Sequence, residues 1–73
     1  MKLRHMKYSI LIQWSEPDQA YIASLPEWGE YARTHGNTYE AALENAKEVL
    51  EDLIYGYEQI GKPLPTPKVL QAV

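Results

Sequence analysis

One long helical pattern constrains the fold of this chain more than any other feature. It occupies residues 36–61, where apolar side chains recur every three or four positions. This spacing predicts an amphipathic helix with a wide buried stripe. Thr38 suits the N-cap position, and Gly61 followed by Pro63 predicts the end, because glycine favours the position after a helix and proline cannot continue one. No other segment is long enough to cover a core, so we expect the preceding strands to pack against this helix.

The segments before the helix predict a small antiparallel sheet. Residues 8–14 alternate between two sets of side chains, which is typical of a half-buried strand. Residues 19–25 and, less regularly, residues 31–35 predict two further strands, separated by turns around Pro17 and Pro26. The first two strands are expected to pair as a hairpin.

The segment after the helix is rich in proline. Pro63, Pro65 and Pro67 have no amide donor, so we expect polyproline II rather than a central strand. Residues 68–73 are then a candidate edge strand. The resulting fold class is α+β, with the order β-β-β-α-β and a small antiparallel sheet covered on one face by one long helix. The other sheet face carries apolar residues such as Leu11, so we expect a second copy or a partner to cover it.

The length and the absence of cysteine limit how the fold can be stabilised. A chain of 73 residues forms a single domain, here residues 1–73, of marginal stability. Disulfides cannot supplement it, so self-association is the expected support. Residues 1–5 are expected to be a flexible extension, and they lack the apolar run of a secretory signal. No stretch approaches the about 18 apolar residues of a membrane span, so we expect a cytoplasmic protein that does not bind membranes.

Acidic side chains are concentrated in the helix. The formal net charge is −3, and the sequence has no basic face of the kind that nucleic-acid-binding proteins carry. A solvated helix face is the plain interpretation of these acids. The alternative is a binding face, since acids four residues apart repel each other and their field attracts a basic partner. Between residues 40 and 58, one lysine accompanies six acids: Glu40, Glu44, Glu48, Glu51, Asp52 and Glu58.

Residues able to carry out catalysis or bind a metal form no recognisable site. His5 and His35 are far apart in the sequence and outside any metal-ligand spacing. The serines lack a nucleophile motif, and Gly36 is better interpreted as part of a helix start than as a phosphate loop. The first strand contains no acid. We therefore expect neither an enzyme nor a protein with a cofactor or metal. A metal-dependent nuclease, the alternative, would need carboxylates that converge in a pocket.

Several stretches of the chain resemble the HicB family of antitoxins. They are residues 6–12, residues 20–26 after the acidic turn, and above all residues 36–46, where Gly-Asn-Thr is followed by Ala-Leu-x-x-Ala. Residues 61–65, Gly-Lys-Pro-Leu-Pro, fit the family as well. The resemblance covers about residues 6–67.

This resemblance implies a partial ribonuclease H-like fold that has lost the nuclease carboxylates, in agreement with the acid-free first strand. It also implies binding to HicA, a small basic RNA-cleaving toxin whose active site becomes blocked. Many members of the family continue into a DNA-binding domain, whereas this sequence stops at Val73. We therefore expect no direct DNA binding.

Our hypothesis from the sequence is a single-domain HicB-like antitoxin that binds and neutralises a HicA-type toxin as a homo-oligomer. For Trp28, at the second turn, the competing interpretation is packing in the core. For Glu16 and Asp18, at the first turn, the competing interpretation is that solvent surrounds them. The alternative function is an orphan HicB-like scaffold or regulator that self-assembles and has a different protein partner. The contacts with the toxin are expected from the two turns and the helix: Glu16, Asp18, Trp28, Glu44, Glu48 and Glu51.

Overall fold

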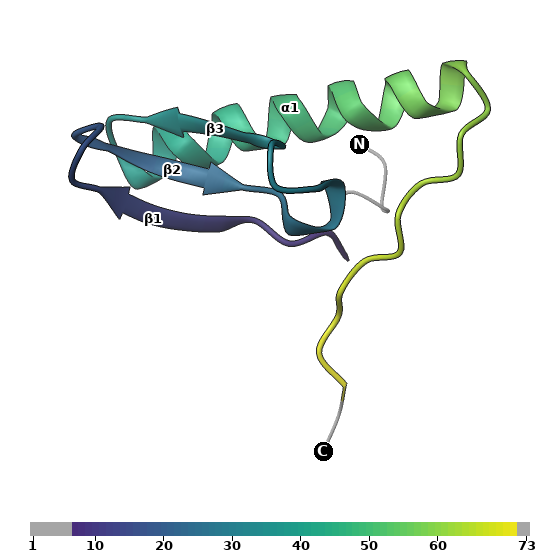
Figure 1. Cartoon of the computed structure of the whole chain (residues 1–73), viewed down its shortest axis with the longest axis horizontal. Coiled ribbons are helices and arrows are strands. Elements are labelled where there is room, and N and C mark those ends of the chain that lie inside the picture. Colours follow the sequence, from purple (N-terminus) through teal and green to yellow (C-terminus); the bar gives the residue numbers. More distant parts are fainter. Residues whose placement is uncertain (1–6, 72–73) are drawn as a thin grey trace.

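The computed structural model describes residues 7–71 and combines a three-stranded sheet with one long α-helix (Figure 1). The α+β class predicted from the sequence is confirmed. Within the described residues, no helix is long and apolar enough to cross a membrane. The elements follow one another as β1 (Leu11–Ser15), β2 (Ala20–Ser24), the short 3-10 helix η2 (Pro26–Trp28), β3 (Arg33–Gly36) and α1 (Tyr39–Gln59).

The strands pair in the order β1-β2-β3, and both pairs are antiparallel. Trp14 lies opposite Tyr21 in the first pair, and Tyr21 lies opposite Gly36 in the second. The β1–β2 turn and the start of α1 are therefore at the same end of the sheet, as Figure 1 shows. The opposite end holds η2 and the residues that lead into β1.

The first strand starts later than the alternation predicted. Residues 8–10 precede β1 and belong to no strand. The physical reason is that polar groups of these residues form hydrogen bonds with distant parts of the chain instead of with a neighbouring strand. The Tyr8 hydroxyl donates to the Pro65 carbonyl at 2.7 Å, and the Ser9 amide donates to the Glu27 carboxylate at 3.1 Å. Tyr8 is itself part of the core.

The second and third strands also differ at their ends from the prediction. Gln19 is in a turn with a φ of 51°, a left-handed conformation that ends the pairing. Tyr31 is 85% exposed and lies in the turn before β3, so the third strand begins at Arg33. Turn geometry, rather than side-chain pattern, sets these boundaries.

The predicted helix start and end are both confirmed. Thr38 is the N-cap residue, and its hydroxyl accepts the Ala41 amide at 3.0 Å. Gly61 has a φ of 70°, which glycine adopts without strain. The Lys62 amide donates to the Tyr57 carbonyl at 2.9 Å, the bond of a Schellman motif. The carbonyls that end the helix therefore have partners.

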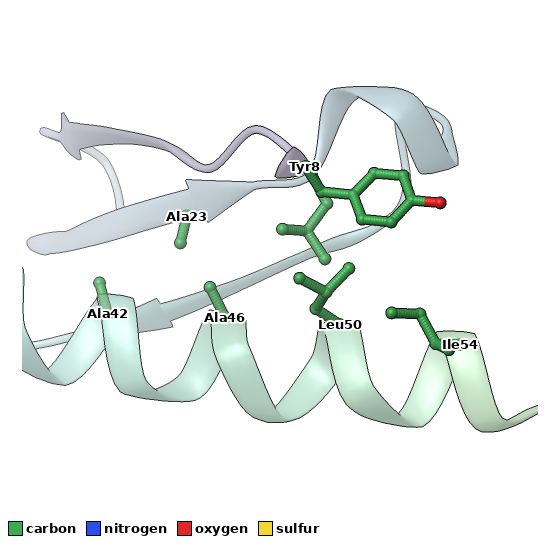
Figure 2. Packing of buried hydrophobic residues seen from close by; sticks show 7 residues of the cluster. Tyr8, Ala23, Ala42, Ala46, Leu50 and Ile54 are labelled. Atoms are coloured by element: carbon green, nitrogen blue, oxygen red, sulfur yellow. The ribbon is translucent and has the colours of Figure 1, made fainter. Parts of the chain in front are cut away.

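The core lies between α1 and the helix-facing side of the sheet (Figure 2). Ala42 and Ala46 face the sheet near Ala23, and all three are completely buried. Small side chains at these positions let the first half of the helix approach the strands closely. Further along α1, Leu50 and Ile54 are buried on the side of Tyr8.

The predicted fourth strand is wrong over the described part of the tail. Residues 62–71 form no strand, and Figure 1 shows them running away from the sheet. The prolines remove amide donors, and the Lys68 amide donates to the Glu27 carboxylate at 2.9 Å rather than to a strand. The order over residues 7–71 is thus β-β-β-α. Residues 72–73 of this predicted strand, and the predicted flexible extension at residues 1–5, lie outside the described residues.

Candidate functional site

The β1–β2 turn holds two of the predicted contact residues in fixed positions. The Trp14 indole donates to the Glu16 carboxylate at 2.8 Å. The Ser15 hydroxyl donates to the Asp18 carboxylate at 2.9 Å and accepts the Asp18 amide at 3.3 Å. Both carboxylates belong to exposed residues. The turn therefore presents two preorganised negative charges to solvent, each already accepting one hydrogen bond.

A shallow hollow of about 630 Å³ lies between this turn and the sheet face that α1 does not cover. Arg33 is its only basic residue, and the carboxylates of Glu16 and Asp18 are its acids. Such a lining offers hydrogen-bond acceptors for one basic or polar side chain of a partner. The lining residues are Gln13, Trp14, Ser15, Glu16, Pro17, Asp18, Ile22, Ser24 and Arg33.

Three aromatic rings form a row beside the turn. Trp14 and Tyr21 meet edge to face with their ring centroids 5.0 Å apart. Tyr21 contacts Tyr39, the first residue of α1, at 4.3 Å. Tyr39 was not among the predicted contact residues, because its position in the sequence gives no sign that it meets a strand. Trp14 and Tyr39 are exposed, whereas Tyr21 packs against the core. Tryptophan and tyrosine are enriched at binding hot spots.

The predicted acids of the helix lie on one exposed surface, which we call the acidic helix face. It is opposite the buried stripe of Ala42, Ala46, Leu50 and Ile54 and comprises Glu40, Glu44, Glu48, Glu51, Asp52 and Glu58, all of them exposed. Lys47 lies 3.7 Å from Glu44, an exposed ion pair that contributes little to stability. The turn acids line the hollow on the sheet face away from α1, so the structure gives two acidic surfaces on different faces.

Trp28 is not part of either acidic surface. It lies in η2 at the other end of the sheet, between Tyr8 and Tyr57, with ring centroids 5.1 and 5.0 Å away. The ring is half-buried against the core, and its indole nitrogen is buried without a hydrogen-bond partner. These contacts are those of a packing residue. Whether Trp28 also touches a partner stays a prediction.

Glu27 is a connecting residue that the sequence did not single out. Its carboxylate accepts the Ser9 hydroxyl at 2.9 Å and the backbone amides of Ser9 and Lys68. Burial by itself raises the pKa of Glu27, but the hydrogen bonds from Lys68, its own amide and Ser9 outweigh this effect and hold the pKa below its ordinary value. The partners are 18 and 41 residues away, so no local pattern could have revealed them.

The described residues contain no group of three or more His, Asp or Glu side chains placed to hold a metal ion. No polar or charged residue in 7–71 is fully buried. The arrangement is suited to contacts with another molecule at exposed carboxylates and aromatic rings. Comparison of the chain with protein-family models, curated proteins and solved structures gave no match in any of the three.

Proposed function

We propose that this chain is a HicB-like antitoxin of the cytoplasm that binds and neutralises a small basic RNase toxin of the HicA type. The proposal includes a partial ribonuclease H-like fold without nuclease activity. The observation that carries it is the acidic helix face, whose carboxylates are all exposed. The Gly-Asn-Thr helix start, with Gly36 packed against α1 and Thr38 as the N-cap residue, supports the family resemblance.

The charge of the acidic helix face suits a basic partner. Glu44 and Glu48 are one helical turn apart, and Glu51 follows three residues later. Like charges at these spacings destabilise a helix by a few tenths of a kcal/mol per pair. A surface that keeps this repulsion creates a negative potential, which speeds the encounter with a basic protein and makes it dependent on salt.

The hollow beside Glu16 and Asp18 supplies a second region of contact. An arginine or lysine side chain of the toxin fits its acceptor-rich rim, and such charge-assisted hydrogen bonds are stronger than neutral ones. The hollow lies on the sheet face away from α1, so it faces away from the acidic helix face and one toxin molecule occupies one of the two surfaces. Binding that covers the catalytic residues of the toxin would block access of RNA. Trp28 lies apart from both surfaces, so the proposal rests on the carboxylates.

The first experiment tests for a partner. The chain is co-expressed with the neighbouring reading frame, purified at low salt, and assayed for protection of RNA from the partner. We expect a stable complex and loss of RNA cleavage. A neighbouring frame that encodes no small basic protein, or two proteins that separate at low salt, would remove the support for the antitoxin function.

The second experiment tests which acids bind. Isothermal titration calorimetry with the purified partner compares Glu44→Gln/Glu48→Gln/Glu51→Gln with Glu16→Gln/Asp18→Asn. We expect Kd to rise at least about tenfold for the helix variant. Glu30→Gln, which removes one exposed acid in the turn before β3, is the matched control and should leave Kd unchanged.

A second function is supported by a different observation. The exposed side chains of β1 favour an orphan HicB-like scaffold that self-assembles and regulates a different protein. A genome without a toxin frame beside this gene, together with a stable homo-oligomer, would favour that function over the antitoxin.

A further inference from the structure

The two outer edges of the sheet differ in how they are covered. β3 lies alongside α1, and the Asn45 side chain donates to the His35 carbonyl at 2.7 Å. An outward carbonyl of this edge therefore has a partner within the chain. β1 lies farthest from the helix, as Figure 1 shows, and has few contacts with it. Among residues 7–71, no segment pairs with the outer side of β1.

The sequence of β1 lacks the features that prevent edge strands from pairing. Natural edge strands are protected by charged side chains, proline or bulges. β1 reads Leu-Ile-Gln-Trp-Ser, with no charge and no proline, and its pairing with β2 is regular over all five residues. Its outer backbone groups are thus open to another strand.

Apolar side chains accompany this open edge. Leu11 is 50% exposed and Trp14 is 45% exposed. Ile12 and Trp14 are on the helix-facing side, because they lie opposite Ala23 and Tyr21, which contact the core. Since α1 lies over β3 and β2, this side of β1 is only partly covered. A strand added beside β1 would cover it.

We propose that β1 pairs in antiparallel fashion with β1 of a second copy of this chain, about a two-fold axis at Gln13. In this register Ile12 lies opposite Trp14 of the second copy, a β-branched and aromatic pair that stabilises a sheet. Leu11 lies opposite Ser15 on the other face, and the two Gln13 side chains face each other. The two sheets become one continuous sheet with both helices on the same face.

A second copy fits this edge better than an unrelated strand. The pairing is self-complementary and places no charge opposite a like charge, although each chain carries a net charge of −3. It also closes, because the remaining outer edges are the β3 strands that α1 and Asn45 cover. Pairing with a second copy also gives this three-stranded sheet, in a chain of 73 residues, the buried apolar area that such small domains lack. The inference does not depend on the antitoxin function, and it gives an interface to the self-assembly of the second proposed function.

The first test measures self-association of the full chain by sedimentation equilibrium between about 5 and 200 μM. We expect a dimer. Gln13→Lys and Gln13→Glu each place like charges at the two-fold axis and should raise the dimer Kd about fivefold or more. An equimolar mixture of the two variants should restore the dimer. His35→Lys, an exposed residue of the covered strand β3, is the matched control and should leave Kd unchanged.

The second test uses the absence of native cysteine. Opposed residues of antiparallel strands have Cα atoms about 4.5–5.5 Å apart, within the reach of a disulfide. Oxidation of Gln13→Cys should therefore give a covalent dimer, whereas His35→Cys should not. Circular dichroism establishes that each variant is folded. A monomeric wild-type chain at about 200 μM, no recovery in the mixture, or equal cross-linking at positions 13 and 35 would each overturn the proposal.

Discussion

Gly36 and Gly56 show how differently two glycines of one small domain are constrained. A Cβ at Gly36 would lie 2.7 Å from the Ala41 carbonyl carbon and 2.8 Å from the Ala42 Cα, both backbone atoms. A Cβ at Gly56, inside α1, would meet nothing within 4 Å. The end of β3 therefore lies directly against the first turn of the helix, while the C-terminal part of the helix has free space around position 56.

The first prediction compares these two positions. Gly36→Ala should destabilise the chain by about 1–3 kcal/mol, because backbone must move to admit the methyl group. Gly56→Ala should stabilise it by about 0.5–1 kcal/mol, since alanine has the higher helix propensity. Urea denaturation measures both free energies of unfolding. Equal effects of the two substitutions would contradict the close approach of β3 and α1.

The second prediction concerns the carboxylate of Glu27. Glu27→Gln should lower the free energy of unfolding at pH 7 by about 1–2 kcal/mol, because the charge-assisted hydrogen bonds from Ser9 and Lys68 are weakened. The folded-state pKa lies below the ordinary value of 4.5. The stabilisation is therefore complete above pH 4.5 and is lost as the pH falls through the folded-state pKa.

Urea denaturation across this pH range checks the prediction. The difference between the wild type and Glu27→Gln should shrink below pH 4.5, the ordinary pKa of the group. Glu30→Gln removes a nearby exposed acid and serves as the control, with no expected change. A difference that stays constant from pH 7 to acid pH would mean that the charge of Glu27 does not hold the tail.

Residue-scale features could be predicted where their partners are local. The sequence identified Thr38 and Gly61 because capping bonds join residues three to five positions apart. It did not identify Glu27, whose partners come from both ends of the chain. Nor did it place Trp28, because the meeting of η2 with Tyr8 and Tyr57 exists only in the folded chain.

At the scale of elements, α1 serves two surfaces with opposite requirements. Its inner face needs small side chains near the strands and larger ones beyond them. The buried residues meet both needs, because Ala42 and Ala46 are followed by Leu50 and Ile54. Its outer face makes no contact with the core and can therefore carry charge at little cost in packing. The two faces can thus be changed independently.

The third prediction follows from this independence. Glu44→Gln/Glu48→Gln/Glu51→Gln should change the free energy of unfolding by less than about 0.5 kcal/mol, because relief of repulsion offsets the loss of the exposed pair with Lys47. Thermal and urea denaturation measure the change. A larger loss of stability would show that these acids support the fold, and reduced binding by this variant could then not be assigned to the interface.

The elements also show the limit of patterns in the sequence. The helix was predictable from its period and caps, since one long pattern outweighs local ambiguity. The strands were predictable as elements but not at their ends, because Tyr8 is drawn into the core and Gln19 into a turn. The expected strand near Val69 failed because Glu27 and Tyr8 hold the tail by single hydrogen bonds.

At the scale of the whole molecule, the charge is separated from the open sheet edge. The acidic helix face carries most of the carboxylates, whereas β1 carries none. The sequence made these acids candidates through their spacing, and the structure divides them between the helix and the β1–β2 turn. The sequence could not show that α1 covers β3 more than β1, because that difference depends on how the helix crosses the sheet. One chain thus presents a charged surface on the helix and an uncharged edge on the sheet.

The fourth prediction uses ionic strength to separate the two interactions. Raising the salt concentration shortens the screening length from about 10 Å at 0.1 M to about 3 Å at 1 M. Binding of a basic partner to the acidic helix face should weaken at least about tenfold between about 50 and 500 mM salt. Pairing of two β1 strands should stay within about threefold and tighten rather than weaken, because salt screens the repulsion between two chains of charge −3. Calorimetry with the partner and sedimentation of the chain alone measure the two trends. Equal weakening of both interactions would mean that charged residues form the self-association interface. This would contradict pairing through β1, which contains no charged residue.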